Sequence, residues 1–185
     1  IVTVQDLIDP VAVCSPLTIQ LNASGNYTLN TADINTISAG STDNCSIVTS
    51  VVSPNTFDCE NVGSVIPVTL TVTDIAGNIA TCATTVTVED KVKPTAICQN
   101  ITVQLDAFGK ASIAATDIDN RSSDACGIAN LSIDKTAFTC LDIGTNSVTL
   151  TVTDNNGNIS TCVSTVTILD TEVPKFTLCS SAQSQ

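Results

Sequence analysis

The stretch VTLTVTDNNGNISTC at residues 148–162 alternates apolar and polar residues on both sides of a short polar turn. Val148, Leu150 and Val152 share one face of an extended chain, since successive side chains of a strand point to opposite faces. Asn and Gly tolerate positive φ angles and an Asp can accept hydrogen bonds from turn amides, so DNNGN at residues 154–158 predicts a tight turn. The stretch therefore predicts a β-hairpin with one buried face and one solvated face.

Nearly the same stretch, VTLTVTDIAGNIATC, occurs at residues 68–82, and other landmarks recur in the same order. Matched residues are 80 to 84 positions apart: Asp154 follows Asp74 by 80, and Asp90 follows Asp6 by 84. Such self-similarity is the signature of a repeat architecture. We therefore divide the chain into the last strand of a preceding repeat (1–8), two modules (9–90 and 91–171) and the first strand of a following repeat (172–185).

Strand signals dominate the remaining sequence. Segments such as LTIQL (17–21), NYTLNTADI (26–34) and TTVTVED (84–90) are rich in Val, Ile and Thr and alternate with period two. No segment carries a convincing helical period. Six or seven short strands in roughly 80 residues predict an all-β chain of tandem immunoglobulin-like β-sandwich modules arranged end to end. Short linkers that contain a proline predict a semi-rigid rod.

Composition excludes several classes of function. The formal net charge is −12 and the sequence contains no histidine. Phosphate contacts need clustered Lys and Arg, so we expect no nucleic-acid partner. No run approaches the roughly 20 apolar residues of a membrane span, so we expect no span in this segment. A catalytic cysteine needs a histidine base and nothing else builds a cleft, so we expect that the chain is not an enzyme.

Nine cysteines, four in each module at matching places, predict disulfides and an oxidising extracellular or cell-surface location. A zinc site is the alternative, but zinc cysteines usually come in closely spaced CxxC pairs, and no two cysteines here are closer in sequence than Cys45 and Cys59. Four cysteines allow three connectivities. We favour pairs that close the two-strand segment and tie the first strand to the last: Cys14–Cys82, Cys45–Cys59, Cys98–Cys162 and Cys126–Cys140. Cys179 then pairs with a cysteine outside the chain.

Aspartates from the linker, from the loop after the second strand and from the last hairpin are expected to converge at one pole of each sandwich. Clustered carboxylates repel each other, and a calcium ion with six to eight oxygen ligands relieves the repulsion. The alternative is that these residues only cap turns, Asp74 and Asp154 above all. The candidate calcium ligands are Asp90, Asp117, Asp119, Asp124 and Asp154 in one set, and Asp6, Asp33, Asn35, Asp43 and Asp74 in the other.

Aromatic residues are scarce. Carbohydrate recognition usually needs aromatic platforms, whereas we expect the phenylalanines to fill a thin core. The aromatic residues are Tyr27, Phe57, Phe108, Phe138 and Phe176.

The run VTDNNGNISTCVSTVTILD (152–170), with one cysteine near the first strand and another after the GN turn, resembles the hyalin repeat (HYR) family. A variant with an added cysteine pair, DNCSIVTSVVSPNTFDC (43–59) and DACGIANLSIDKTAFTC (124–140), is similar to repeats of large Bacteroidota-type surface adhesins. The resemblance covers nearly the whole chain. It implies an immunoglobulin-like fold, a secreted or cell-surface location and a role in adhesion, but it implies little about a ligand.

Our first hypothesis is a structural spacer repeat of a long extracellular adhesin or cell-surface filament, stapled by disulfides and stiffened by calcium. Similar consecutive units favour it, because a spacer needs number more than individuality. The alternative is a binding module whose acidic pole or exposed edge strand engages a glycan or a partner protein. Expected partners are neighbouring repeats of the same chain, a surface ligand that the sequence does not identify, and copies that assemble laterally or by strand exchange.

Overall fold

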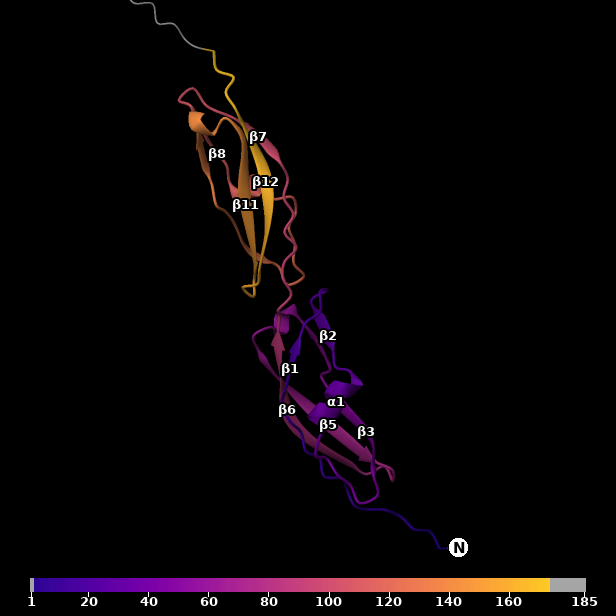
Figure 1. The fold of residues 1–185 in the computed structure, drawn as a ribbon. Helices are drawn as coiled ribbons and strands as arrows, with labels where there is room; N and C mark the ends of the chain where they lie inside the picture. The colour runs from indigo at the N-terminus through magenta and orange to yellow at the C-terminus, as the bar shows by residue number, and fades with distance from the viewer. Residues whose placement is uncertain (1, 174–185) are drawn as a thin grey trace, which may run out of the picture. The chain divides into compact units, whose positions relative to one another are not determined.

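The computed structural model of the chain describes residues 2–173 (Figure 1). Each repeat contributes six strands, one short α-helix and one 3-10 turn, in the same order. The first repeat contains β1 (Leu17–Gln20), β2 (Asn26–Thr28), α1 (Thr31–Ile37), β3 (Ile47–Ser53), β4 (Thr56–Asp58), η1 (Cys59–Asn61), β5 (Val65–Asp74) and β6 (Ile79–Glu89). The second contains β7 (Ile101–Gln104), β8 (Lys110–Ser112), α2 (Ala115–Ile118), β9 (Ile128–Ile133), β10 (Ala137–Thr139), η2 (Cys140–Asp142), β11 (Gly144–Asp154) and β12 (Ile159–Leu169).

The chain is mostly β and forms two β-sandwich domains in tandem, so the predicted fold class is confirmed. The first compact unit comprises the residues up to Lys93 together with two loops of the second repeat, residues 124–127 and 154–158. The second unit comprises the other described residues from Pro94 to Val173. The unit boundary therefore lies a few positions beyond the predicted module boundary after Asp90.

Both units have the same sheet topology. A four-stranded sheet has the order β1-β6-β5-β3 in the first unit and β7-β12-β11-β9 in the second, and a two-stranded sheet pairs β2 with β4 or β8 with β10. The long hairpin strands β11 and β12 run beside each other in Figure 1, and the first strand of each repeat adds in parallel to the last. The predicted hairpin is therefore the centre of each four-stranded sheet.

The buried face of each hairpin is the one that the alternation predicts. Val148, Leu150 and Val152 on β11 are fully buried, as are Leu70 and Val72 at the matched places on β5. Apolar side chains from the two-stranded sheet and from the short helix close the core over this face. In the first unit these are Phe57 and Ile37, and in the second Phe138 and Ile118.

Helix α1 contradicts the expectation that no segment is helical. The segment at residues 26–34, predicted to be a strand, contains β2 and then the start of α1. The helix begins with a capping box: Asn30 Oδ1 accepts from Ala32 N (2.8 Å) and Asp33 Oδ2 accepts from Asn30 N (2.9 Å). A helix of seven residues makes only two turns, so its period is too short to stand out in the sequence.

The terminal segments show no strand where the structure describes them. Residues 2–8, predicted to be the last strand of a preceding repeat, pair with no other described segment, and the side chains of Val2 and Val4 are more than nine-tenths exposed. A strand needs a second backbone segment to pair with, and within residues 2–173 no strand pairs with this segment, whose backbone oxygens at Asp6 and Ile8 accept from the Asn78 side chain instead. The predicted strand at 172–185 lies outside the described residues except for 172 and 173.

Candidate functional site

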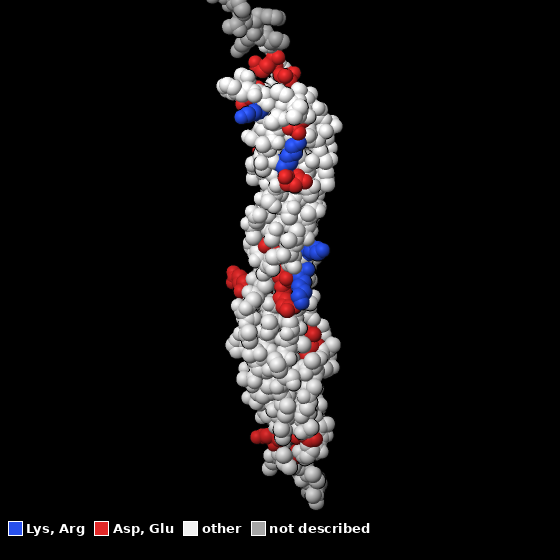
Figure 2. Space-filling view, turned by 60° about the vertical axis from the view of Figure 1, so that its left-hand side comes forward, with Lys and Arg blue, Asp and Glu red and all other residues white. Residues whose placement is uncertain are grey.

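Two groups of potential metal ligands share two matched positions of the repeat, Asp6 with Asp90 and Asp43 with Asp124. Asp6, Asp43 and Asp74 form one group, and Asp90, Asp124 and Cys126 form the other. Within each group, side-chain ligand atoms lie within 4.8 Å of one another. Both groups belong to the first compact unit. On the face in Figure 2, acidic side chains also gather in small groups on a surface that is otherwise largely uncharged.

The first group is built by three different segments. Asp74 ends β5 and is buried; its Oδ1 accepts from Asn78 N (2.8 Å) and its Oδ2 from Asn78 Nδ2 (2.7 Å). Asp43 Oδ2 accepts from Cys45 N at 2.7 Å, and Asp6 Oδ1 accepts from Ile8 N at 3.1 Å. The other carboxylate oxygen of Asp43, Oδ1, is buried and has no hydrogen-bond partner among the described residues.

The local environment favours the charged form of Asp6 and Asp74. Hydrogen bonds from the Cys45 thiol and from the Ile8 amide hold the pKa of Asp6 below its usual value. Burial raises the pKa of Asp74, but hydrogen bonds from the side chain and backbone of Asn78 outweigh it, so the net shift is downward. The Asp6 carboxylate in turn raises the pKa of the Cys45 thiol. Negative charges therefore lie close together at neutral pH, which is the situation that attracts a cation.

The second group repeats the main features of the first. The Asp90 side chain is only 7% exposed; its Oδ1 accepts from Val92 N (3.0 Å), while its buried Oδ2 has no partner within the described part of the chain. Asp124 Oδ1 accepts from Cys126 N at 2.8 Å. The sulfur of Cys126 is part of a disulfide, so this group offers a hard cation two carboxylates and no thiolate.

Matched asparagines in the two hairpin turns hold each aspartate in place, and the sequence analysis did not identify them. Asn78 Nδ2 donates to the backbone oxygens of Ile8 (3.2 Å) and Asp6 (3.4 Å). Asn158 Nδ2 donates to Asp90 O at 3.2 Å. The GN pair that recurs in both turns is the sequence signal that could have found them.

The structure separates the remaining predicted ligands from these groups. Asp33 caps α1 and also accepts from the Tyr27 hydroxyl at 2.8 Å, and Asn35 is an exposed residue of the same helix. Asp117 Oδ2 accepts from Ala114 N (2.8 Å) at the start of α2, and Asp119 Oδ1 accepts from Ser122 N (3.1 Å). These side chains satisfy local backbone donors, which is the turn-cap alternative.

Asp154 also acts as a turn cap. Its Oδ1 accepts from the backbone amides of Asn156 (2.9 Å) and Asn158 (2.8 Å), and its Oδ2 accepts from Asn158 Nδ2 (2.8 Å). Both oxygens are thus satisfied within the hairpin, and Asp154 is not in the group with Asp90 and Asp124.

In each repeat, one disulfide ties the segment before the first strand to the last strand. Cys14 bonds Cys82 with a Cα–Cα distance of 6.1 Å, and Cys98 bonds Cys162 with 5.8 Å. These are two of the predicted pairs. The three disulfides among residues 2–173 are typical of an oxidising, extracellular compartment.

The other two predicted pairs, Cys45–Cys59 and Cys126–Cys140, are not formed. The structure instead bonds Cys59 to Cys126 with a Cα–Cα distance of 5.2 Å, and leaves Cys45 and Cys140 exposed with no disulfide partner in residues 2–173.

Sheet topology explains this correction. We expected the two strands between each cysteine pair to form a hairpin, but β3 pairs with β5 in one sheet while β4 pairs with β2 in the other. The second repeat does the same with β9 and β10. The strands diverge, so the flanking cysteines are not brought together. Cys179 lies outside the described residues.

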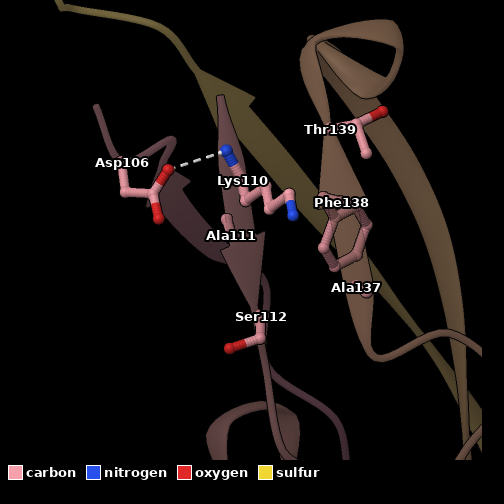
Figure 3. Close-up of a pocket in the computed structure, with 7 residues that line it drawn as sticks. All are labelled: Asp106, Lys110, Ala111, Ser112, Ala137, Phe138 and Thr139. Atoms are coloured by element: carbon pink, nitrogen blue, oxygen red, sulfur yellow. Dashed lines mark hydrogen bonds between the residues drawn. The ribbon is translucent and has the colours of Figure 1, made fainter. Parts of the chain in front are cut away.

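A groove over the two-stranded sheet of the second unit is a further candidate binding site. Its lining residues are Asp106, Lys110, Ala111, Ser112, Ala137, Phe138 and Thr139 (Figure 3). Asp106 accepts from the backbone amide of Lys110 at 2.9 Å, and the Lys110 side chain points toward Phe138. The Phe138 ring is buried, as expected of a core residue. The Nζ atom of Lys135 lies 4.7 Å from the centre of this ring.

The phenylalanines fill the core with one exception. Phe57 and Phe138 are buried and Tyr27 is half-buried, whereas Phe108 is 86% exposed. Phe108 lies in the tight turn between β7 and β8, and turns of this kind run over the surface, so the expectation that it packs in the core is wrong. Phe176 lies outside the described residues.

The described part of the chain contains no helix that is both long and apolar enough to cross a membrane. No protein-family model matches the sequence, and no curated protein matches it.

The comparison with solved structures found similarities of low sequence identity, three of which follow. The extracellular domain of protocadherin GammaB4 is 15% identical over 87% of this chain and 32% of that chain, with a TM-score of 0.39. Mouse clustered PcdhgC3 EC1-3 is 15% identical over 88% of this chain and 68% of that chain, with a TM-score of 0.39. The titin I-band fragment I67–I69 is 11% identical over 86% of this chain and 65% of that chain, with a TM-score of 0.38. The chain thus spans about a third of the length of the protocadherin GammaB4 structure.

Proposed function

We propose that this chain is a structural spacer segment of a long extracellular adhesin or cell-surface filament, and that it has no catalytic role. The observation that carries the proposal is the repetition of one disulfide-closed sandwich: Cys14–Cys82 and Cys98–Cys162 close matched loops of 68 and 64 residues. A disulfide across such a loop limits how far a module can extend once its core opens. This property suits a segment that carries tension between a surface and a binding tip.

A binding assay on the isolated chain tests the spacer role. A spacer transmits force without recognising a target, so the immobilised chain should retain no glycan from a glycan array and no protein at micromolar concentration. The same chain, inserted in one, two or four copies between a bead anchor and a nanobody tip, should support adhesion under flow whatever the copy number. Specific retention by the chain alone would contradict the spacer role.

The second candidate function is a binding module, favoured by the groove over β8 and β10 and by exposed Phe108 beside it in the sequence. An exposed aromatic ring gives a sugar or an apolar side chain a surface to pack on. If retention is observed, Phe108→Ser should abolish it. Phe57→Leu, a change in the core of the other unit, is the matched control and should leave it unchanged.

We further propose that calcium binds the two acidic groups. Calcium is the hard cation of extracellular sites and prefers carboxylate and carbonyl oxygens. The buried oxygens Asp43 Oδ1 and Asp90 Oδ2, which lack hydrogen-bond donors among the described residues, are the feature that a cation would satisfy. Asp6, Asp43 and Asp74 would hold one ion, while Asp90 and Asp124 supply only two carboxylates and should hold calcium more weakly.

Calorimetric titration with calcium tests this proposal. We expect binding at millimolar calcium or below and a rise in melting temperature, since a ligand at a hundredfold excess over its Kd stabilises the native state by about 2.7 kcal/mol. Asp43→Asn should weaken binding, whereas Asp117→Asn, at a helix cap outside both groups, should not. If no heat of binding appears and chelator leaves the melting temperature unchanged, the aspartates are turn caps only.

A further inference from the structure

Cys45 and Cys140 are the matched counterparts of the two cysteines that bond each other. Cys126 follows Cys45 by 81 positions, and Cys140 follows Cys59 by the same offset. The structure bonds Cys59 to Cys126, while Cys45 and Cys140 are exposed and unpaired among the described residues. The chain therefore carries one disulfide between its repeats, Cys59–Cys126. It also carries an unpaired counterpart of each of these two cysteines: Cys140 corresponds to Cys59, and Cys45 corresponds to Cys126.

We propose that Cys140 of one copy of this chain bonds Cys45 of a second copy, in the arrangement that Cys59 and Cys126 adopt within the chain. The proposal rests on the internal repeat and the observed disulfide, and it stands whether or not the spacer function is correct.

Cys140 is placed as Cys59 is. Each is the first residue of a 3-10 turn, η2 or η1, that follows the short strand of the two-stranded sheet. The Cys59 sulfur lies 3.5 Å from Gly25 O, and the Cys140 sulfur lies 3.8 Å from Gly109 O. Gly109 follows Gly25 by 84 positions, and the two glycines have φ angles of 70° and 71°. Cys140 thus presents its sulfur from the same local structure that presents the bonded one.

Both glycines leave room for the sulfur that they contact. A Cβ added to Gly25 would lie 2.7 Å from the Cys59 sulfur and 3.0 Å from the Cβ of Ala125, next to the bonded Cys126. A Cβ added to Gly109 would lie 2.5 Å from the Cys140 sulfur. The glycine that leaves room for the Cys59 sulfur in the observed disulfide therefore has a counterpart, Gly109, that leaves the same room for the Cys140 sulfur.

Cys45 is placed as Cys126 is. The backbone amide of Cys45 donates to Asp43 Oδ2 at 2.7 Å, and that of Cys126 donates to Asp124 Oδ1 at 2.8 Å. Each cysteine comes shortly before the edge strand of its four-stranded sheet, β3 or β9. The turn that carries the bonded cysteine is thus repeated around the unpaired one.

The surface next to Cys140 fits a protein partner. Leu141 follows it and is 97% exposed, and Phe108 precedes Gly109 and is 86% exposed. The two residues flank the contact between the Cys140 sulfur and Gly109 O, and large apolar side chains this exposed on segments that meet are typical of a surface that another protein covers. The matched positions in the first repeat, beside the bonded Cys59, are Ser24 and Glu60. The exposed apolar side chains therefore occur only beside the unpaired Cys140.

The bond forms by thiol–disulfide exchange with a small disulfide such as oxidised glutathione. The Cys140 thiolate attacks one glutathione sulfur and releases the other glutathione as a thiolate. The Cys45 thiolate of the second copy then attacks the Cys140 sulfur of the mixed disulfide and releases the second glutathione. Two protein thiols lose two electrons and two protons, and one oxidised glutathione becomes two reduced molecules.

Two single-thiol variants test the pairing, both with Cys179→Ser. One also carries Cys45→Ser and keeps only the thiol of Cys140; the other also carries Cys140→Ser and keeps only the thiol of Cys45. The two proteins are mixed in equal amounts with oxidised glutathione, with one of them labelled with ¹⁵N, and the dimers are separated without reduction and weighed by mass spectrometry. Random pairing would make half of the dimers mixed, whereas the proposal predicts that mixed dimers exceed both homodimers together by about tenfold.

A displaced thiol is the matched control. Ser147 is exposed on β11 and is not at a cysteine position of the repeat. A variant with Ser147→Cys and with Cys45, Cys140 and Cys179 all replaced by serine should give no excess of mixed dimers with the Cys45 protein. Peptide mapping should find the Cys140–Cys45 link and the three original disulfides intact. Random proportions, an absence of dimers, or links through other cysteines would each overturn the proposal.

Discussion

Stretching single molecules tests how the disulfides set the length of the chain under load. Cys14 and Cys162 are 148 positions apart in the sequence (162 − 14). When Cys14–Cys82 and Cys98–Cys162 are both closed, tension between these points passes only through the linker from Cys82 to Cys98, which spans 16 positions (98 − 82). At most about 3.6 Å per residue, the oxidised path reaches about 58 Å and the reduced path about 530 Å.

The difference between the two states is the combined length of the two closed loops, whose sequence separations are 68 and 64. Unfolding of the reduced protein should therefore release about 475 Å more contour length than unfolding of the oxidised protein. Cys59–Cys126 does not alter the oxidised value, because the direct path from Cys82 to Cys98 is already the shortest.

Optical tweezers with handles at the two chain ends measure this difference directly, on protein prepared with and without reductant. Cys45→Ser is the matched control, since it removes an unpaired thiol and should leave the oxidised trace unchanged. If the oxidised protein releases the full length of both loops, the loops are not closed, and the argument for a tension-bearing spacer fails with them.

Three further predictions concern stability and its dependence on pH. Leu150→Ala removes a fully buried side chain and should cost about 2–5 kcal/mol in urea unfolding; Val163→Ala, at a 63% exposed position, should change stability by less than about 0.5 kcal/mol, and equal losses would contradict the assigned core. Asn30→Ala removes the cap of α1 and should cost about 1 kcal/mol in the same assay, so an unchanged midpoint would argue against the helix. The hydrogen bond and ion pair with Lys135 (2.6 Å) lower the pKa of Asp142 from its usual 3.8, so this carboxylate stabilises the fold above pH 3.8 and the contribution is lost as the pH falls through the lower folded pKa. Asp142→Asn should accordingly lower the melting temperature at pH 7 and have a progressively smaller effect as the pH falls below 3.8, and a pH-independent effect would mean that charge is not the cause.

The local alternation of apolar and polar residues was sufficient to predict the strands that have one buried face and one solvated face. The alternation in β11 and β5 places Val148 and Leu70 in the core because burial of one face is decided by the period of the strand alone. The turn chemistry of DNNGN likewise predicts the hairpin that pairs β11 with β12. These features depend on residues that are neighbours in sequence.

The features that the sequence did not predict depend on which sheet a strand joins. The short strands β4 and β10 leave the strand before them and pair across the sandwich, and nothing within Thr56–Asp58 marks that choice. The cysteine pairing follows from it, so two of the four predicted pairs were wrong. The candidate calcium ligands were limited in the same way. Asp33 and Asp117 were predicted to lie in a loop, whereas each lies in the first turn of a short helix, α1 or α2.

The two orphaned carboxylate oxygens help to decide between a cation site and a set of turn caps. An aspartate that only caps a turn can satisfy both of its oxygens locally, as Asp154 does with three donors from its own hairpin. Asp43 and Asp90 each leave one buried oxygen without a donor from residues 2–173, although burying an unpaired polar atom costs about 1–3 kcal/mol. The same costly feature appears once in each acidic group, and in each case the unsatisfied oxygen belongs to a cluster of carboxylates. A bound cation would satisfy that oxygen and offset the repulsion at once, so we expect removal of calcium to destabilise the first unit more than the second, whose described residues hold no such group.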